Sequence, residues 1–149
     1  MLVIDDDSGA RSLIARMLGR DFRVVEAEDG ATGLTLARDL TPDVITLDIL
    51  MPGMDGWAVL RALKADAALA GVPVVVVTIV DERAAGFAAG AADYLTKPVD
   101  RTRLLEALRR AAHEHGAAAA LFADDDDAPA REALLAGVRD AVAARMPVA

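Results

Sequence analysis

The sequence contains no cysteine, which excludes both a disulfide framework and a zinc–thiolate site. Aromatic residues make up only 3% of the 149 residues while hydrophobic residues make up 54%, so the core must be built from Val, Leu, Ile and Ala. No apolar run approaches the length of a membrane span, and no signal-peptide pattern is present. We therefore expect a soluble, cytoplasmic protein with no membrane segment.

Basic residues are also too few to balance the acidic ones. Sixteen Lys and Arg face 24 Asp and Glu, giving a formal charge of -8. Such a charge argues against nonspecific binding to nucleic acid, and we expect no direct nucleic-acid contact. It does suit a pocket of clustered carboxylates that binds a cation.

Short apolar runs alternate along the chain with segments of helical pattern. The runs lie at 1–4, 22–26, 44–47, 74–78 and 93–96, and helices are expected to begin near Ser8, Asp29, Asp55, Asp81 and Asp100. Ser8 is the expected cap of the first helix, and Leu13, Ile14, Met17 and Leu18 form its apolar stripe. The alternation predicts an α/β fold, a doubly wound parallel sheet of five strands with helices on both faces.

The most informative stretch is the run 44–47, which ends abruptly at Asp48. Shortly afterwards Met51-Pro52-Gly53 can continue neither a strand nor a helix, so the chain must turn there. Asp48 is therefore expected at the carboxyl end of a buried strand. In open α/β sheets this edge is where ligands bind.

Three other strands end in residues that carry chemistry: Asp5 and Asp6, Thr78, and Lys97. The carboxyl ends of parallel strands share one edge of the sheet, so these side chains can converge. Clustered carboxylates repel one another unless a cation is present, and hard oxygen ligands suit Mg²⁺. An added ammonium and hydroxyl complete a site suited to phosphoryl transfer, in which one carboxylate can act as the nucleophile.

The ordered set of motifs resembles the receiver domain of bacterial response regulators. It comprises Ile4-Asp5-Asp6, Leu47-Asp48 with Met51-Pro52-Gly53-Met54-Asp55-Gly56, Val77-Thr78, Tyr94, and Lys97-Pro98. The resemblance covers the chain from Met1 to about His115. It implies the flavodoxin-like strand order 2-1-3-4-5, with the site at the switch point between the first and third strands.

The resemblance also assigns roles by position. Asp48 matches the phosphorylated aspartate, Asp6 the direct Mg²⁺ ligand, and Asp5 the acid that holds the metal through water. The carbonyl of Leu50 matches the remaining protein ligand of the metal. Thr78 and Lys97 match the hydroxyl and ammonium that meet the phosphoryl group, Tyr94 the aromatic switch, and Lys97-Pro98 a cis peptide bond.

Two departures from the family pattern concern the surroundings of Asp48. Ile79 is β-branched where the family usually places a small residue after the threonine. Leu50 and Val80 are apolar where many relatives carry polar side chains that help water attack the acyl phosphate. Together the departures predict a long-lived acyl phosphate and slow phosphorylation by small donors.

The resemblance implies a phosphoacceptor module of a two-component phosphorelay rather than an enzyme, with at most slow self-catalysed phosphorylation and dephosphorylation. A histidine kinase or histidine phosphotransfer protein supplies the phosphoryl group; a homodimer or an intramolecular partner domain is left open. One alternative is a receiver-like scaffold that is never phosphorylated. The other is a phosphatase with an Asp nucleophile, but that chemistry wants a second acid two residues further on, where Leu50 stands.

The composition changes after Gly116, so we expect a receiver domain at 1–115 and an Ala- and Asp-rich linker with a helical tail at 116–149. The tail is too short for a DNA-binding or catalytic output domain. However, 125–131 repeats 5–11 at five of seven positions. A second receiver beginning in the tail is therefore an equal alternative to a linker.

Overall fold

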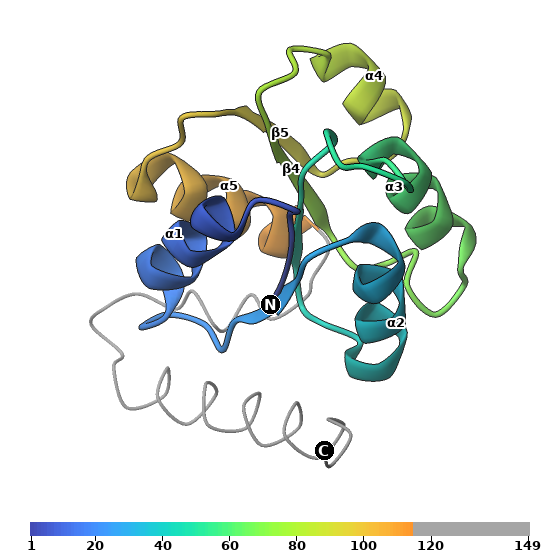
Figure 1. The fold of residues 1–149 in the computed structure, drawn as a ribbon, viewed down its shortest axis with the longest axis horizontal. Coiled ribbons are helices and arrows are strands. Elements are labelled where there is room, and N and C mark those ends of the chain that lie inside the picture. The colour runs from blue at the N-terminus through green and yellow to red at the C-terminus, as the bar shows by residue number, and fades with distance from the viewer. Residues whose placement is uncertain (115–149) are drawn as a thin grey trace.

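The computed structural model describes residues 1–114, which form a parallel sheet with helices on both faces (Figure 1). The five strands are β1 (Leu2–Ile4), β2 (Val25–Ala27), β3 (Ile45–Leu47), β4 (Val74–Thr78) and β5 (Asp93–Thr96). Their order in the sheet is β2-β1-β3-β4-β5, and every neighbouring pair is parallel. The predicted doubly wound fold and its strand order are thereby confirmed.

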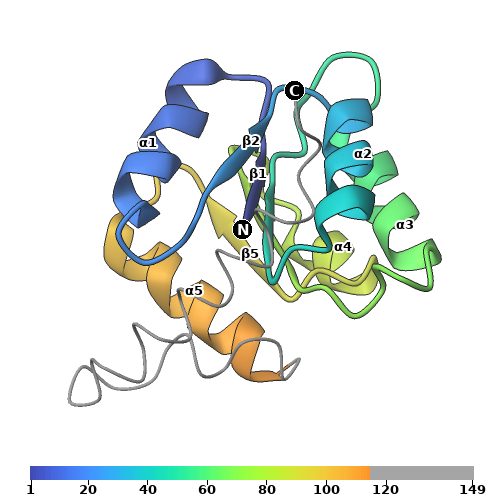
Figure 2. The same ribbon diagram turned by 90° about the horizontal axis from the view of Figure 1, so that it is seen from below.

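The five helices of the described chain are α1 (Ser8–Leu18), α2 (Gly30–Leu40), α3 (Gly56–Ala65), α4 (Arg83–Ala88) and α5 (Arg101–Glu114). Helices α1 and α5 cover one face of the sheet, and α2, α3 and α4 lie on the other (Figure 2). Within residues 1–114 no helix has the length and apolar character needed to cross a membrane. The predicted linker and tail at 116–149 lie outside the described residues.

Each buried strand supplies side chains to both faces, because successive residues of a strand point to opposite sides. In β1, Leu2 and Ile4 join the core under α2 and α3, whereas Val3 joins the core under α1 and α5. In β4, Val76 and Val77 are divided between the two cores in the same way. Strands covered on both faces are mostly apolar, and in β1 and β4 the first polar side chains, Asp5 and Thr78, fall at the strand ends, whereas β3 buries Thr46 one residue before Leu47.

The predicted cap of α1 is wrong by one residue. Asp7 is the N-cap, and its Oδ1 accepts hydrogen bonds from the N–H groups of Gly9 and Ala10 at 2.9 and 3.3 Å. Ser8 is instead the first helical residue. Asp and Ser are similarly good caps, so the sequence alone did not distinguish two adjacent candidates.

One strand boundary and one buried position near α1 also differ from prediction. The second strand begins at Val25 rather than Phe22, because the N–H of Phe22 bonds back to the carbonyl of Leu18 at 2.8 Å and prolongs the turn after α1. Leu13, predicted to face the core, is 44% exposed, whereas Ile14 and Leu18 are buried. The buried stripe of α1 is therefore narrower than its apolar pattern suggests.

Candidate functional site

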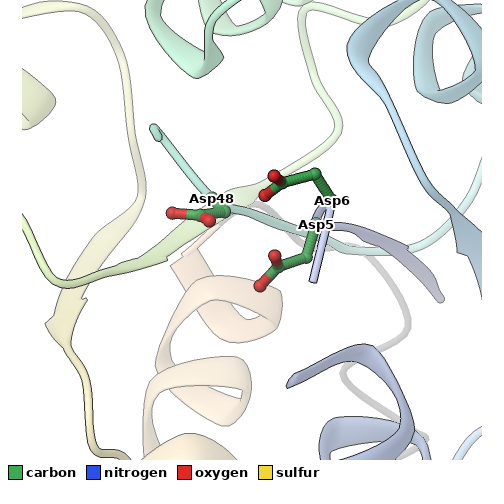
Figure 3. A group of neighbouring side chains, drawn as sticks. All are labelled: Asp5, Asp6 and Asp48. Carbon is green, nitrogen blue, oxygen red and sulfur yellow. The ribbon is translucent and has the colours of Figure 1, made fainter. Parts of the chain in front are cut away.

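Three carboxylates converge at the carboxyl edge of the sheet, as Figure 3 shows. Asp5 and Asp6 follow β1, and Asp48 follows β3, its immediate neighbour in the sheet. One oxygen from each carboxylate lies within 4.8 Å of the others. Asp5 and Asp48 are buried, whereas Asp6 is exposed, so solvent reaches the cluster at Asp6.

Lys97 places its ammonium group against this cluster from the end of β5. Its Nζ donates a hydrogen bond to Asp5 Oδ2 at 2.8 Å and lies 3.6 Å from Asp48 Oδ2. The Lys97-Pro98 peptide bond that follows is cis, as the sequence resemblance implied. The ammonium group therefore pairs with two of the three carboxylates, and the cluster keeps an excess of negative charge.

The electrostatics of the pocket favour a further cation. Burial and then the negative charge of Asp5 raise the pKa of Asp48, although Lys97 and Thr78 partly offset this. Burial lowers the pKa of Lys97, but its hydrogen bond to Asp5 and the charge of Asp48 outweigh burial and leave that pKa raised. A bound divalent cation would relieve the repulsion that raises the Asp48 pKa, and three carboxylates are a donor set that Mg²⁺ accepts.

The sheet ladder itself positions these residues. The Asp48 N–H bonds to the carbonyl of Ile4 at 2.9 Å, and the Lys97 N–H bonds to the carbonyl of Thr78 at 2.8 Å. Behind Asp48, α3 starts so close that a Cβ on Gly56 would overlap the Asp48 carbonyl oxygen. Only glycine lets the backbone approach that closely.

Thr78 and Tyr94, the two expected switch residues, are both buried. Hydrogen bonding from the Thr78 hydroxyl favours the charged form of Asp48. The Tyr94 hydroxyl donates to the carbonyl of Val80 at 2.5 Å and accepts from the N–H of Glu82 at 3.2 Å. Tyr94 is thus held inward against the loop that leads from Thr78 to α4.

The three apolar residues that depart from the family pattern follow Asp48 and Thr78 closely in the chain. Ile79 is 65% exposed and Leu50 is 50% exposed, while Val80 is half-buried. The Leu50 N–H donates to Asp48 Oδ1 at 3.2 Å. The side chain of Leu50 carries no polar group.

One supporting residue was missed from the sequence. Arg11 donates from Nη1 to the Asp5 carbonyl at 2.7 Å, and its Nε lies 3.4 Å from Glu26 Oε1. It thereby links the end of β1 to β2 beside the site. The sequence held a weak signal of this role, because an arginine in the first turn of a helix is unfavourable next to the positive end of the helix dipole. Such a residue is therefore expected to have a partner outside the helix.

A doubly wound sheet with charged side chains gathered at its switch point defines a class of α/β proteins that bind ligands at the carboxyl edge. The model of the response regulator receiver domain family matches residues 1–109. The chain belongs to this family. Receiver domains are signalling modules of two-component systems and interact with histidine kinases or phosphotransfer proteins.

Several relatives show how the similarity is distributed. The chain is 42% identical over 113 residues to the response regulator PleD of Caulobacter vibrioides, a match that covers 73% of this chain and 25% of PleD. It is 39% identical over 112 residues to protein PilH of Pseudomonas aeruginosa, covering 72% of this chain and 93% of PilH. The chemotaxis protein CheY4 of Vibrio cholerae superposes with a TM-score of 0.69 at 29% identity, covering 74% of this chain and 95% of CheY4.

Proposed function

We propose that the chain accepts a phosphoryl group on Asp48 from a phosphohistidine, with Mg²⁺ bound beside it, and changes conformation in response. The observation that carries this proposal is the cluster of Asp5, Asp6 and Asp48 within 4.8 Å, with Lys97 3.6 Å from Asp48. A carboxylate nucleophile next to a cation site and an ammonium group matches the needs of phosphoryl transfer, in which charge develops on the transferred oxygens.

The transfer itself breaks one bond and forms one. A carboxylate oxygen of Asp48 attacks phosphorus, the P–N bond to the donor imidazole breaks, and that nitrogen keeps the electron pair and takes up a proton. The Lys97 ammonium group pairs with the phosphoryl oxygens, and the Thr78 hydroxyl donates a hydrogen bond to one of them. Asp5, Asp6, Asp48 and the Leu50 carbonyl would hold Mg²⁺, which neutralises charge on those oxygens when bound.

A protein donor fits the surface beside the pocket. An apolar hollow of about 310 Å³ lies between α1 and the ends of β4 and β5, and Leu13, Ile14, Ile79 and Lys97 are among its lining residues. Leu13 and Ile79 are both exposed. A partner that covers these side chains would bring its own histidine toward Lys97 and Asp48 while excluding water.

Thr78 and Tyr94 support the proposed conformational response. When Thr78 moves toward a phosphoryl group, the Val80 carbonyl and Glu82 N–H that hold the Tyr94 hydroxyl move with the same loop. Phosphorylation would therefore shift the population of Tyr94 positions and alter the surface formed by α4, β5 and α5.

The proposal is tested by labelling with acetyl phosphate or a purified phosphorylated kinase, followed by intact-mass measurement. The wild type should gain one phosphoryl group in the presence of Mg²⁺ and lose it slowly, Asp48→Asn should gain none, and Asp6→Asn should lose the Mg²⁺ dependence. Asp7→Asn is the matched control, because Asn still caps α1 and the exposed Asp7 is not one of the three clustered carboxylates, so labelling should persist.

The same experiment separates the two alternatives. A chain that no donor phosphorylates would be a receiver-like scaffold. Steady turnover of a small phosphate ester would indicate a phosphatase. The half-exposed Leu50 argues against this alternative, because it is apolar at the position where that chemistry needs an acid. Stoichiometric labelling that survives in Asp48→Asn would refute the assignment of Asp48.

A further inference from the structure

A hollow of about 260 Å³ on the face formed by α4, β5 and α5 concentrates arginine side chains. Its charged lining residues are Arg83 from α4, Asp93 from β5, and Arg103, Glu106 and Arg110 from α5. Tyr94 also lines it. Three cations against two anions make this hollow locally positive on a chain whose formal charge is -8.

The pairing inside the hollow leaves arginines available. Arg110 is engaged, since its Nη2 lies 2.7 Å from Asp93 Oδ2. Among residues 1–114, neither the Arg83 nor the Arg103 guanidinium has a carboxylate within ion-pair distance. Guanidinium groups bind carboxylates in paired, directional hydrogen bonds. An acidic ligand would therefore satisfy two cations that the described chain leaves open.

We propose that the acidic run Asp124–Asp127 of this same chain docks in this hollow. The run is the longest block of like charge in the sequence, and its four adjacent carboxylates complement Arg83 and Arg103, which form no ion pair within residues 1–114. This inference goes beyond the proposed function, because it requires neither phosphorylation of Asp48 nor a metal.

The covalent connection favours the chain's own tail over a separate molecule. Asp124 follows Glu114, the last residue of α5, by ten residues, a length of chain that can reach at most about 35 Å. Along the helix, Arg103 lies eleven residues before Glu114, or about 17 Å at 1.5 Å per residue. The connection is therefore long enough for the run to fold back, and tethering raises its effective concentration at the hollow.

A second copy of the chain is the competing occupant. Two chains of formal charge -8 repel each other, whereas the tail brings its charge without that cost. Docking would cover part of the surface beside Tyr94. If Asp48 is phosphorylated as proposed, the tail would then compete with any partner that reads the position of Tyr94.

The absence of native cysteine allows a clean test. A nitroxide is attached to Ala128→Cys, directly after the acidic run, and the relaxation of backbone amides is measured in the full-length chain without phosphodonor. The amides of Arg83 and Tyr94 are the reporters, because α4 and β5 are not neighbours of the tail in sequence. We expect both amides to broaden, and we expect the broadening to disappear between about 0.1 M and 1 M salt as the charges are screened.

Matched variants decide the outcome. Replacing all four residues of Asp124–Asp127 by Asn should abolish the broadening, as should Arg83→Gln combined with Arg103→Gln. Arg61→Gln removes one exposed arginine from α3 and should leave the broadening unchanged. Broadening that persists in the Asn variant, or is absent in the wild type, would overturn the proposal. So would equal broadening in a mixture of spin-labelled and isotope-labelled chains, which would identify a second copy as the occupant.

Discussion

Gly86 in α4 is the residue whose replacement most directly tests how Tyr94 is held. A Cβ at Gly86 would overlap Cδ2 of the Tyr94 ring and lie 2.8 Å from its Cε2. The ring has no room to yield, because Tyr94 is fully buried and its hydroxyl is bonded to Val80 and Glu82. Gly86→Ala should therefore displace α4, the ring, or both.

Three contributions set the expected change in the free energy of unfolding. Alanine in place of glycine in a helix stabilises it by about 1 kcal/mol. Overpacking a buried contact costs about 1–3 kcal/mol. Expelling the whole Tyr94 ring would cost about 4–6 kcal/mol, from roughly 150–250 Å² at 25 cal/mol per Å². Because α4 has only six residues, movement of α4 is the cheaper response. We expect a net destabilisation of about 1 kcal/mol.

The ionisation of Tyr94 provides an independent measurement, because it is the only tyrosine in the sequence. Burial raises its pKa above the ordinary value of 10, so the folded state favours the neutral phenol. This contribution to stability is present below pH 10 and is lost as the pH rises through the raised pKa. In Gly86→Ala, tyrosinate absorbance should titrate at lower pH than in the wild type, since the ring is less enclosed.

Gly71→Ala is the matched control, because no heavy atom lies within 4 Å of the Cβ it would add. Its unfolding free energy in urea should stay within about 0.5 kcal/mol of wild type, with the same Tyr94 titration. If Gly86→Ala instead gains about 1 kcal/mol and leaves the Tyr94 pKa unchanged, the ring is not confined by α4 and the reasoning is refuted.

Three further predictions concern the sheet and the site. Thr46 has a buried hydroxyl without a hydrogen-bond partner among the described residues, so Thr46→Val should raise the free energy of unfolding by about 1–2 kcal/mol. A lower free energy of unfolding for Thr46→Val in urea titration would show that the hydroxyl has a partner. The raised pKa of Asp48 means that its charged form destabilises the folded state, so Asp48→Asn should be more stable than wild type at pH 7 with a chelator present. This gain in the free energy of unfolding should vanish below pH 3.8, where Asp48 is protonated in both states, and a gain independent of pH would contradict the prediction. Ile79→Ala should speed labelling by acetyl phosphate at saturating Mg²⁺, and Leu50→Asn should speed loss of the label. A barrier change of about 1.4 kcal/mol alters a rate about tenfold, so changes under about twofold in both rates would show that these apolar side chains do not control access to Asp48.

The strands, their order and the gathering of site residues could be read from the sequence, with the strand order and roles coming from the family resemblance. This worked because β1 and β4, which are buried on both faces, are apolar until Asp5 and Thr78, and because a carboxylate, Asp48, directly follows the buried β3. That the carboxylates converge follows from parallel pairing alone. The structure confirms this placement, whereas the phosphoryl-accepting role of Asp48 remains a prediction.

Other features depended on neighbours that are distant in sequence. Adjacent Asp7 and Ser8 were equally good candidates for the N-cap of α1. Only the structure shows that the helix begins at Ser8 and that the Asp7 side chain caps it. The closeness of Gly86 to Tyr94, and the gathering of arginines from α4 and α5 into one hollow, arise where helices pack against the same edge of the sheet. The spacing of apolar residues within each segment indicates a strand or a helix, so the sequence by itself determined the elements and the edge of the sheet that carries the site. Contacts between side chains of separate elements depend on how those elements pack, and only the tertiary structure decided them.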